Sequence, residues 1–246
     1  MDIYISIDDT DNLESTGSGE LADFLRHELQ DNGLVSWSSS IARHQLLEHT
    51  SIAYTSHNSS MCFQAAIAEH SLAAVIEYSQ SFLKRRSAVG SDPGLCVAVE
   101  NDGLDRARII EFGLAVKQSV VTKSLAYALA RETGVHLSEH GGTGDGIIGA
   151  LAAIGLYLSG SDGRIRGWLQ LGENRQSAMV KDLCSHAEVD GVVDAHGSML
   201  AADARVEFNG EKIKTVRSNH LRVIPVARDE AGPVWKILTK AEVKCF

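Results

Sequence analysis

The sequence lacks three features that would each point to a class of protein. Its four cysteines lie far apart and form no Cys-x-x-Cys pair, so a zinc ribbon is excluded. No apolar run reaches the ~20 residues of a membrane-spanning helix, and no basic-then-apolar leader opens the chain. Basic residues are outnumbered, and the net charge of −9 argues against broad, non-specific binding to nucleic acid. We therefore expect a cytoplasmic protein with reduced thiols and no membrane partner.

The chain is long enough to bury a substantial core. It has 246 residues, of which 44% are hydrophobic and 22% charged. The pattern of strands and helices predicts an α+β fold, with a mixed sheet and helices in the first two-thirds and an antiparallel β region at the C-terminus. We expect a kinase-like catalytic α/β module over 1–165, which can include a ferredoxin-like subdomain, and a smaller β-rich region over 166–246.

Hydrophobic periodicity places the expected elements. Strands are predicted at 3–7, 35–41, 61–68 and 95–99, and helices at 20–30, 72–86, 104–117, 122–131 and 177–186. A polar loop covers 43–60, with one short strand at 51–55 as an option. Near the C-terminus, Asn209-Gly210 predicts a two-residue hairpin over 206–213, and the segments 221–227 and 234–238 are expected to pair.

Three carboxylates crowd the first turn, at Asp8, Asp9 and Asp11, directly after the first predicted strand. The ends of strands are where α/β proteins usually bind ligands. Like charges this close repel unless a cation neutralises them or some stay protonated. A hydrated Mg²⁺ that carries nucleotide phosphates fits such a turn, because Mg²⁺ is typically held by one or two carboxylates plus substrate phosphates. The alternative is a solvated turn that caps the next helix.

A second candidate segment is rich in glycine and runs from Gly141 to Gly155. Gly144, Gly146 and Gly149 match a dinucleotide-binding spacing, but the preceding 136–139 is a poor strand and no matching βαβ unit follows. The glycines allow two interpretations: a nest of backbone amides that binds an anion at a helix start, or close packing of a buried helix. The residues leave both open.

Four landmarks in order carry a resemblance to a known family. They are the IDDTD sequence ending at Asp11, the polar loop with Thr55 and Asn58, Asp92-Pro93-Gly94, and the segment from Gly144 to Gly155. Over roughly 1–160 the chain resembles the N-terminal half of the archaeal tRNA-isoleucine agmatinylcytidine synthetases. Those enzymes use ATP and Mg²⁺ to activate the C2 oxygen of a wobble cytidine, which agmatine then displaces.

The resemblance implies roles for particular residues. Asp8, Asp9 and Asp11 would be catalytic and would hold the metal. The implied nucleotide-binding residues are Thr10, Thr55, Asn58, Gly144, Asp145, Gly146 and Gly149.

The chain also departs from the family pattern. The family continues into an OB-fold and a zinc ribbon, whereas here no zinc cysteines follow. The family's Asn-Gly is Asn58-Ser59, and its basic residue between two glycines is Asp145. Together with the net charge, these departures make us expect no tRNA partner.

We carry three hypotheses from this sequence. The first is a Mg²⁺-dependent, ATP-using enzyme, kinase-like or ligase-like, that acts on an unknown small-molecule acceptor. The second is a non-catalytic nucleotide- or nucleic-acid-binding module of the same fold. The third is a homo-oligomer in which the acidic turn and the glycine segment are purely structural.

Overall fold

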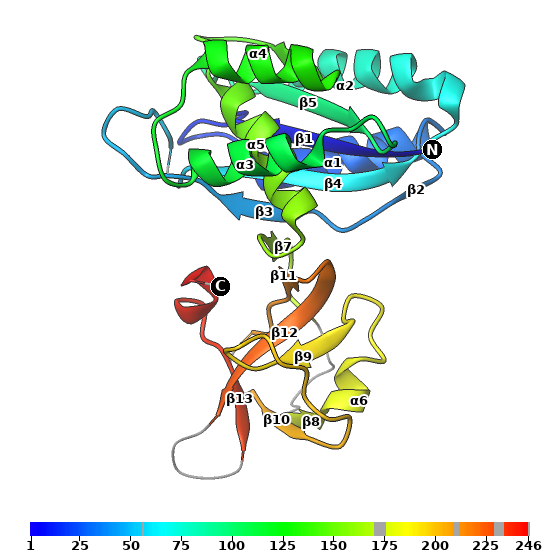
Figure 1. Cartoon of the computed structure of the whole chain (residues 1–246), viewed down its shortest axis with the longest axis vertical. Helices are drawn as coiled ribbons and strands as arrows, with labels where there is room; N and C mark the ends of the chain where they lie inside the picture. The colour runs from blue at the N-terminus through cyan, green and yellow to red at the C-terminus, as the bar shows by residue number, and fades with distance from the viewer. Residues whose placement is uncertain (56, 170–175, 209–211, 229–233, 246) are drawn as a thin grey trace. The chain divides into compact units, whose positions relative to one another are not determined.

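A computed structural model describes residues 1–55, 57–169, 176–208, 212–228 and 234–245. The chain forms two compact units, Met1–Ser159 and Gly160–Phe246, which are described separately (Figure 1). The structure is α+β, as the sequence predicts. Among the described residues, no helix combines the length and the apolar character that a membrane crossing needs.

The first unit is built on one sheet whose spatial order is β6-β5-β1-β4-β3, with β2 also pairing with β4. The central strand β1 pairs with β4 on one side and β5 on the other. The strands are β1 (Asp2–Asp8), β2 (Trp37–Ser38), β3 (Ala42–Gln45), β4 (Ser59–Ala66), β5 (Gly94–Val99) and β6 (His136–Glu139).

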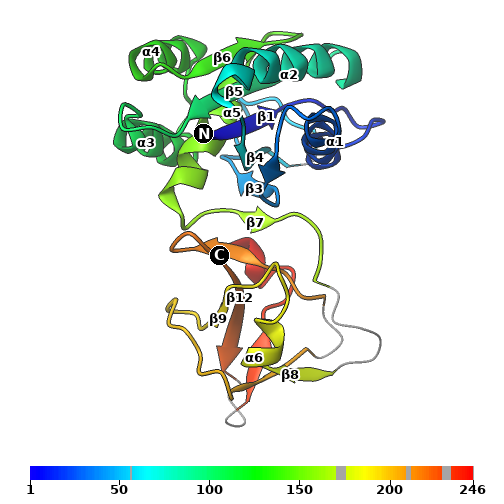
Figure 2. The ribbon, with the colours of Figure 1, turned by 90° about the vertical axis from the view of Figure 1, so that its right-hand side faces the viewer.

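Helices cover both faces of this sheet. In Figure 2, α1 and α2 lie on one side of it, whereas α5 crosses the other side beneath α3. The helices are α1 (Ser18–Asp31), α2 (Leu72–Arg86), α3 (Arg106–Val116), α4 (Lys123–Thr133) and α5 (Gly146–Ser159), with a 3₁₀ turn at Glu69–Ser71.

The order β1-α1-β3-β4-α2-β5 is a split βαβ arrangement. Each helix joins strands that are not neighbours, and the strand between them runs the opposite way. The described pairings within the first unit are therefore antiparallel.

The core explains why large apolar residues alternate with other side chains along β1. Ile3, Ile5 and Ile7 pack with α1 and α2, while Tyr4 contacts Tyr157 of α5 and Ser6 Oγ donates to a backbone carbonyl of the same helix. Both faces of the strand are thus buried. The flanking strands carry two fully buried cysteines, Cys62 and Cys96.

The second unit is smaller and rich in short strands. Its β12 pairs with β11 and β13 antiparallel and with β9 parallel, and β10 pairs with β13 parallel and β8 antiparallel. The antiparallel pairs follow the prediction for this region, and the two parallel pairs make the strand pairing of the chain mixed. The elements are β7 (Arg164–Ile165), β8 (Ser177–Met179), α6 (Val180–Leu183), β9 (Gly191–Val193), β10 (Arg205–Glu207), β11 (Val216–Ser218), β12 (Leu221–Arg228), β13 (Trp235–Ile237) and a 3₁₀ turn at Glu242–Cys245.

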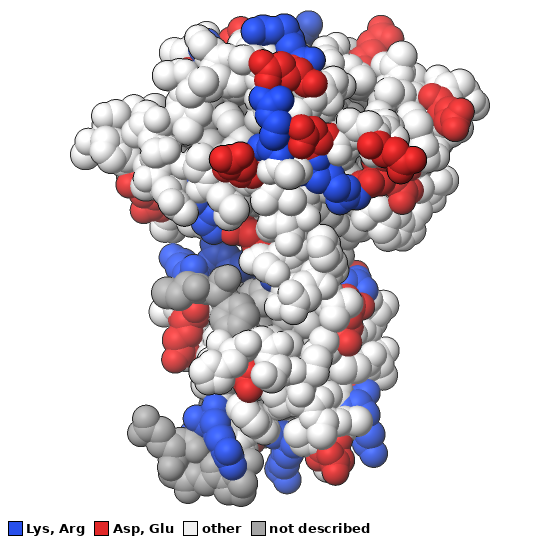
Figure 3. Space-filling view, in the orientation of Figure 1, with Lys and Arg blue, Asp and Glu red and all other residues white. Residues whose placement is uncertain are grey.

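Charge is divided unequally between the units. Residues 1–159 contain 10 Lys and Arg against 20 Asp and Glu, whereas residues 160–246 contain 13 against 12. The negative charge of the whole chain therefore belongs to the first unit. On the face seen in Figure 3, Lys and Arg are interspersed with Asp and Glu on both units.

Most predicted helices of the first unit are confirmed to within about two residues, and the predicted strands at 61–68 and 95–99 match β4 and β5. The strand expected at 35–41 is wrong in extent: only Trp37–Ser38 pairs there, and the unpredicted β3 follows. The segment 136–139, judged a poor strand, is β6. It pairs antiparallel with β5, so this segment of the described chain forms no dinucleotide-type βαβ unit.

In the second unit the helix predicted at 177–186 is mostly wrong, since strand β8 leads into a single helical turn. The hairpin turn at 209–211 lies outside the described residues. Of its predicted strands, β10 pairs instead with β8 and β13, and Ile213 bridges Leu169. The predicted pairing of 221–227 with 234–238 is confirmed as β12 with β13.

The crossing of α3 and α5 gives the first prediction. A Cβ added at Gly155 would overlap the carbonyl oxygen of Ile109. We expect Gly155→Ala to lower the free energy of unfolding by about 1–3 kcal/mol through overpacking, despite a helical propensity gain of up to ~1 kcal/mol. Urea unfolding measures this, with Gly17→Ala as control because no atom lies within 4 Å of that added Cβ. Equal stability of the two variants would contradict a tight crossing.

Candidate functional site

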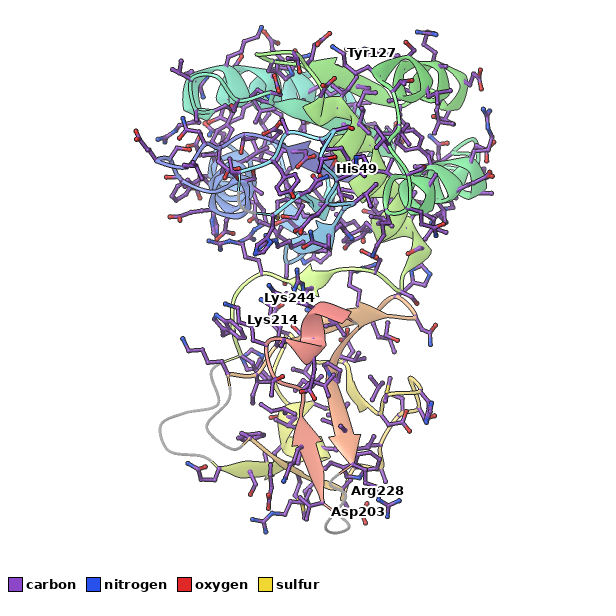
Figure 4. The ribbon with its side chains drawn as sticks, turned by 90° about the vertical axis from the view of Figure 1, so that its left-hand side faces the viewer. His49, Tyr127, Asp203, Lys214, Arg228 and Lys244 are labelled. Atoms are coloured by element: carbon purple, nitrogen blue, oxygen red, sulfur yellow. The ribbon has the colours of Figure 1, made fainter. Side chains whose placement is uncertain are left out.

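A cavity of about 460 Å³ opens in the first unit where β1 ends and α5 begins. Five carboxylates line it, and Lys123 is the one Lys or Arg among the described residues of its wall. Figure 4 views this unit from the side on which His49, in the loop after β3, and Tyr127 of α4 lie. The acidic members of the wall are Asp8, Asp9, Asp11, Asp92 and Asp145.

Asp8 is the most deeply placed of these acids. It ends β1, is only 7% exposed, and rests against the first turn of α5, where a Cβ at Gly149 would overlap its Oδ2. Burial raises the pKa of Asp8 well above its usual range, and the charges of Asp9 and Asp11 add to the effect. Ionising Asp8 therefore requires a counter-charge.

Asp9 bends the chain out of the strand. Its φ of +50° is left-handed, a region that Asp and Asn tolerate better than most residues. Partial burial, followed by the charges of Asp92, Asp11 and Asp145, raises its pKa to about 6. Asp9 thus experiences the negative charges of three other carboxylates of the cavity.

Asp11 links the acidic turn to the start of α1 and to the polar loop. Its Oδ1 accepts hydrogen bonds from the Ser18 hydroxyl at 2.5 Å and the Ser18 amide at 3.3 Å. Its Oδ2 accepts from the Thr55 hydroxyl at 3.3 Å. Asp11 therefore orders two segments of the cavity wall, as well as adding charge.

The glycine segment does form an anion nest, and its occupant is Asp92. Asp92 Oδ1 accepts from the amides of Thr143 and Gly144. Gly142 has a positive φ, and a Cβ there would overlap the Asp92 carboxylate. Lys123, at the start of α4, donates to the Thr143 carbonyl and to Glu139. These contacts hold the loop closed beside the cavity.

The helix that follows approaches the sheet through its glycines. A Cβ at Gly146 would overlap the Asp92 carbonyl, and one at Gly94 would overlap the backbone of Gly146. Close packing is therefore the role that the structure gives Gly146 and Gly149. Both interpretations of the glycine segment apply, each to a different part of it.

Most of the site residues predicted from the sequence line this cavity, including the three acids of the first turn. Two do not line it: Thr10 is buried and donates to Ser18, and Gly144 is buried behind the loop. The polar loop is fixed by one of the lining residues, Asn58, which donates to the Leu47 carbonyl at 2.7 Å. The lining residues outside the first turn are Thr55, Asn58, Asp145, Gly146 and Gly149.

Asp92 and Lys123 were not predicted as site residues. Asp92 belongs to the Asp92-Pro93-Gly94 landmark, whose position before a strand could have indicated it. Nothing in the local sequence marks Lys123, because only the packing of α4 beside β6 brings it to the cavity.

The donor set suits a metal that a ligand helps to bind. Among the described residues, no three His, Cys, Asp or Glu side chains already converge on one metal position. Asp8, Asp9 and Asp11 are hard oxygen donors on one turn, which suits Mg²⁺ held by one or two carboxylates with phosphate and water completing its shell.

Comparisons with known proteins bear on the fold. No family model and no curated protein matches the sequence. Among solved structures, a complex of TiaS with an isoleucine tRNA and ATP matches with a TM-score of 0.56 and 18% identity, over 63% of this chain and 36% of that chain. Apo TiaS, a tRNA agmatidine synthetase, gives 0.54 and 18% over 63% and 35%. A complex of TiaS with the tRNA, AMPCPP and agmatine gives 0.54 and 14% over 81% and 49%.

These matches confirm, at the level of fold, the resemblance that the sequence motifs predict. The chain spans a third to a half of the length of those neighbours, so their activities are not transferred with the fold.

The raised pKa of Asp9 predicts a pH dependence of stability. The folded state holds this proton more tightly than the unfolded chain, so the metal-free protein should lose stability as pH rises from about 4 to about 6. Asparagine at position 9 suits the left-handed backbone. We expect Asp9→Asn to reduce the pH-dependent decrease in the free energy of unfolding by about 1–2 kcal/mol, after allowance for solvent screening. Urea unfolding in EDTA across this range measures it. An exposed control, Asp102→Asn, should keep the wild-type profile, and an unchanged profile in Asp9→Asn would contradict the assignment.

Proposed function

We propose that the protein is a Mg²⁺-dependent, ATP-using enzyme with a kinase-like or ligase-like step, acting on an unknown small-molecule acceptor. The observation that supports this most is the cavity at the end of β1, where five carboxylates face a single lysine among the described residues of the wall. The fold shared with structures of an ATP-bound tRNA-modifying enzyme points in the same direction.

The chemistry of phosphoryl and nucleotidyl transfer fits such a wall. These reactions depend mainly on positioning the phosphates and neutralising their charge. Asp8, Asp9 and Asp11 would hold Mg²⁺, and the metal would carry phosphate oxygens that the carboxylates alone would repel. Lys123 would add a positive charge from the α4 side.

A specific observation also favours the non-catalytic alternative. The amides of Thr143 and Gly144 already donate hydrogen bonds to Asp92, so these donors are not available to bind a phosphate. In a binding module of the same fold, the nucleotide would bind without turnover. Thermal unfolding with ATP, with and without Mg²⁺, followed by an assay for nucleotide products, separates the two. Stabilisation should reach about 2.7 kcal/mol at 100 times the dissociation constant.

Replacing the most deeply buried carboxyl group of the cavity should separate catalysis from folding. We expect Asp8→Asn to abolish ATP turnover while the metal-free protein keeps or gains stability, because a neutral amide replaces a carboxylate whose ionisation is opposed by burial. Product formation and urea unfolding are measured together, with Glu14→Gln in the exposed part of the same turn as control. Undiminished turnover in Asp8→Asn would return the acidic turn to a structural role.

The residue at 145 tests which side of the cavity receives the phosphates. Asp145 is exposed and lines the wall at the start of α5. If phosphate lies there, Asp145→Arg should tighten Mg²⁺–ATP binding by about 1 kcal/mol through Coulomb attraction at a partly exposed site. Calorimetry measures this, with Asp145→Asn showing the effect of charge removal alone. Weaker Mg²⁺-dependent binding in both variants would instead identify Asp145 as a metal ligand.

The absence of a tRNA partner remains a prediction, and basic side chains of the second unit provide the variants that test it. Its basic side chains include Lys212 and Lys214, which lie 5.8 and 4.8 Å from the centre of the Trp168 ring (Lys214 is labelled in Figure 4). We expect total tRNA to bind weakly and to be released at physiological salt. Filter binding at two salt concentrations tests this. Sub-micromolar binding that survives physiological salt, and is lost in Lys212→Glu/Lys214→Glu, would contradict it.

A further inference from the structure

A second cation lies just behind the cavity wall, on the side opposite Lys123. Arg43 is on β3, the last strand of the first unit in the order β6-β5-β1-β4-β3, whereas Lys123 pairs with Glu139 of β6 at the start of that order. Arg43 is aligned with Met61 of β4, which is aligned with Ile7 of β1. Its side chain therefore projects from the α1 face, next to the strand end that bears the acidic turn.

The contacts of Arg43 leave most of its hydrogen-bonding capacity unused. Its Nε donates to the Ser59 hydroxyl at 2.9 Å, and Ser59 lines the cavity. Among the described residues, its two terminal nitrogens have no hydrogen-bond or ion-pair partner. Burial lowers the pKa of the guanidinium, and the charge of Asp11 works against that lowering. An arginine remains charged under these conditions.

A half-buried guanidinium with free donors is costly unless a partner completes it. Lys123 already donates to Glu139 and to the Thr143 carbonyl. Arg43 is therefore the better placed of these two cations to offer donors to an incoming anion. Its planar fork matches the oxygens of a phosphate, which it can bind in a bidentate manner.

We infer that the guanidinium of Arg43 enters the cavity past Ser59 and binds the terminal phosphate of the nucleotide, while the acidic turn holds the metal on the inner side. This assignment rests on the proposed function, because it names a phosphate-binding residue of the same site. The rival role is structural: Arg43 would only offset the charge of Asp11 from behind the wall.

The two roles differ in which ligands notice the arginine. A terminal-phosphate contact affects ATP and inorganic tripolyphosphate but not AMP. A charge offset acting through Asp11 alters binding of all three in similar proportion. Tripolyphosphate also tests the site without any requirement for nucleotide recognition or turnover.

The experiment is calorimetry with Mg²⁺ and each of ATP, AMP and tripolyphosphate. We expect Arg43→Gln to weaken ATP and tripolyphosphate by about 10- to 100-fold, the loss of charge-assisted hydrogen bonds, and AMP by less than about 2-fold. Arg43→Lys keeps the charge without the fork and should lie between. The control Arg26→Gln removes a half-buried arginine of α1 that is held by Asp23 and Ser38.

Unfolding curves establish that each variant is folded, and Arg43→Lys carries the test if Arg43→Gln is not. Three outcomes would overturn the assignment: wild-type protein that binds no tripolyphosphate, an unchanged tripolyphosphate affinity in the variants, or an equal loss for AMP. Arg43-dependent tripolyphosphate binding without ATP turnover would remove the enzyme proposal and leave Arg43 assigned. ATP turnover that is unchanged in the Arg43 variants would support the enzyme proposal and overturn the assignment of Arg43.

Discussion

The site depends on the close approach of α5 to the end of β1. Gly94 and Gly146 let the helix start meet the sheet backbone, and Gly149 leaves space for the carboxylate of Asp8. A side chain at any of these positions would overlap an atom of the neighbouring element. The same approach buries Asp8 and opposes its ionisation. Packing and electrostatics at this point are therefore consequences of one constraint, the absence of a Cβ on three residues.

Charge organises what surrounds that contact. Asp11 uses its carboxylate to hold Ser18 and Thr55, and Asp92 fills the amide nest of the glycine segment. Among the described residues, no such hydroxyl or loop amide from another segment donates to Asp8, Asp9 or Asp145. Lys123 lies beside β6 and Arg43 on β3, at the two ends of the first unit's strand order. This distribution favours a ligand that places a metal ion against the acidic turn and anionic groups near Lys123 and Arg43. A metal-bound polyphosphate has that character.

Local signals in the sequence predicted much of this and failed where the outcome depended on distant packing. The acidic turn followed from an alternating strand and three carboxylates, and the helices α1 and α2 followed from apolar spacing. The strand β6 was missed because its residues are only half-buried at a sheet edge, where periodicity is weak. Asp92 and Lys123 reach the cavity from segments far apart in the chain. The helix expected at 177–186 failed because Ser177–Met179 pairs as β8 with β10, a tertiary contact that local propensity does not reveal. The whole-chain net charge did not reveal that the two units carry charge so differently.

Locating the metal and the nucleotide together tests most directly whether the acidic turn holds a metal-bound nucleotide. Crystals grown with Mn²⁺ and a non-hydrolysable ATP analogue allow the metal to be placed from its anomalous scattering. We expect one metal at coordination distance from one or two of Asp8, Asp9 and Asp11, with phosphate oxygens completing its shell inside the cavity. A nucleotide bound elsewhere on the chain, or a cavity that holds no metal at saturating Mn²⁺, would contradict it.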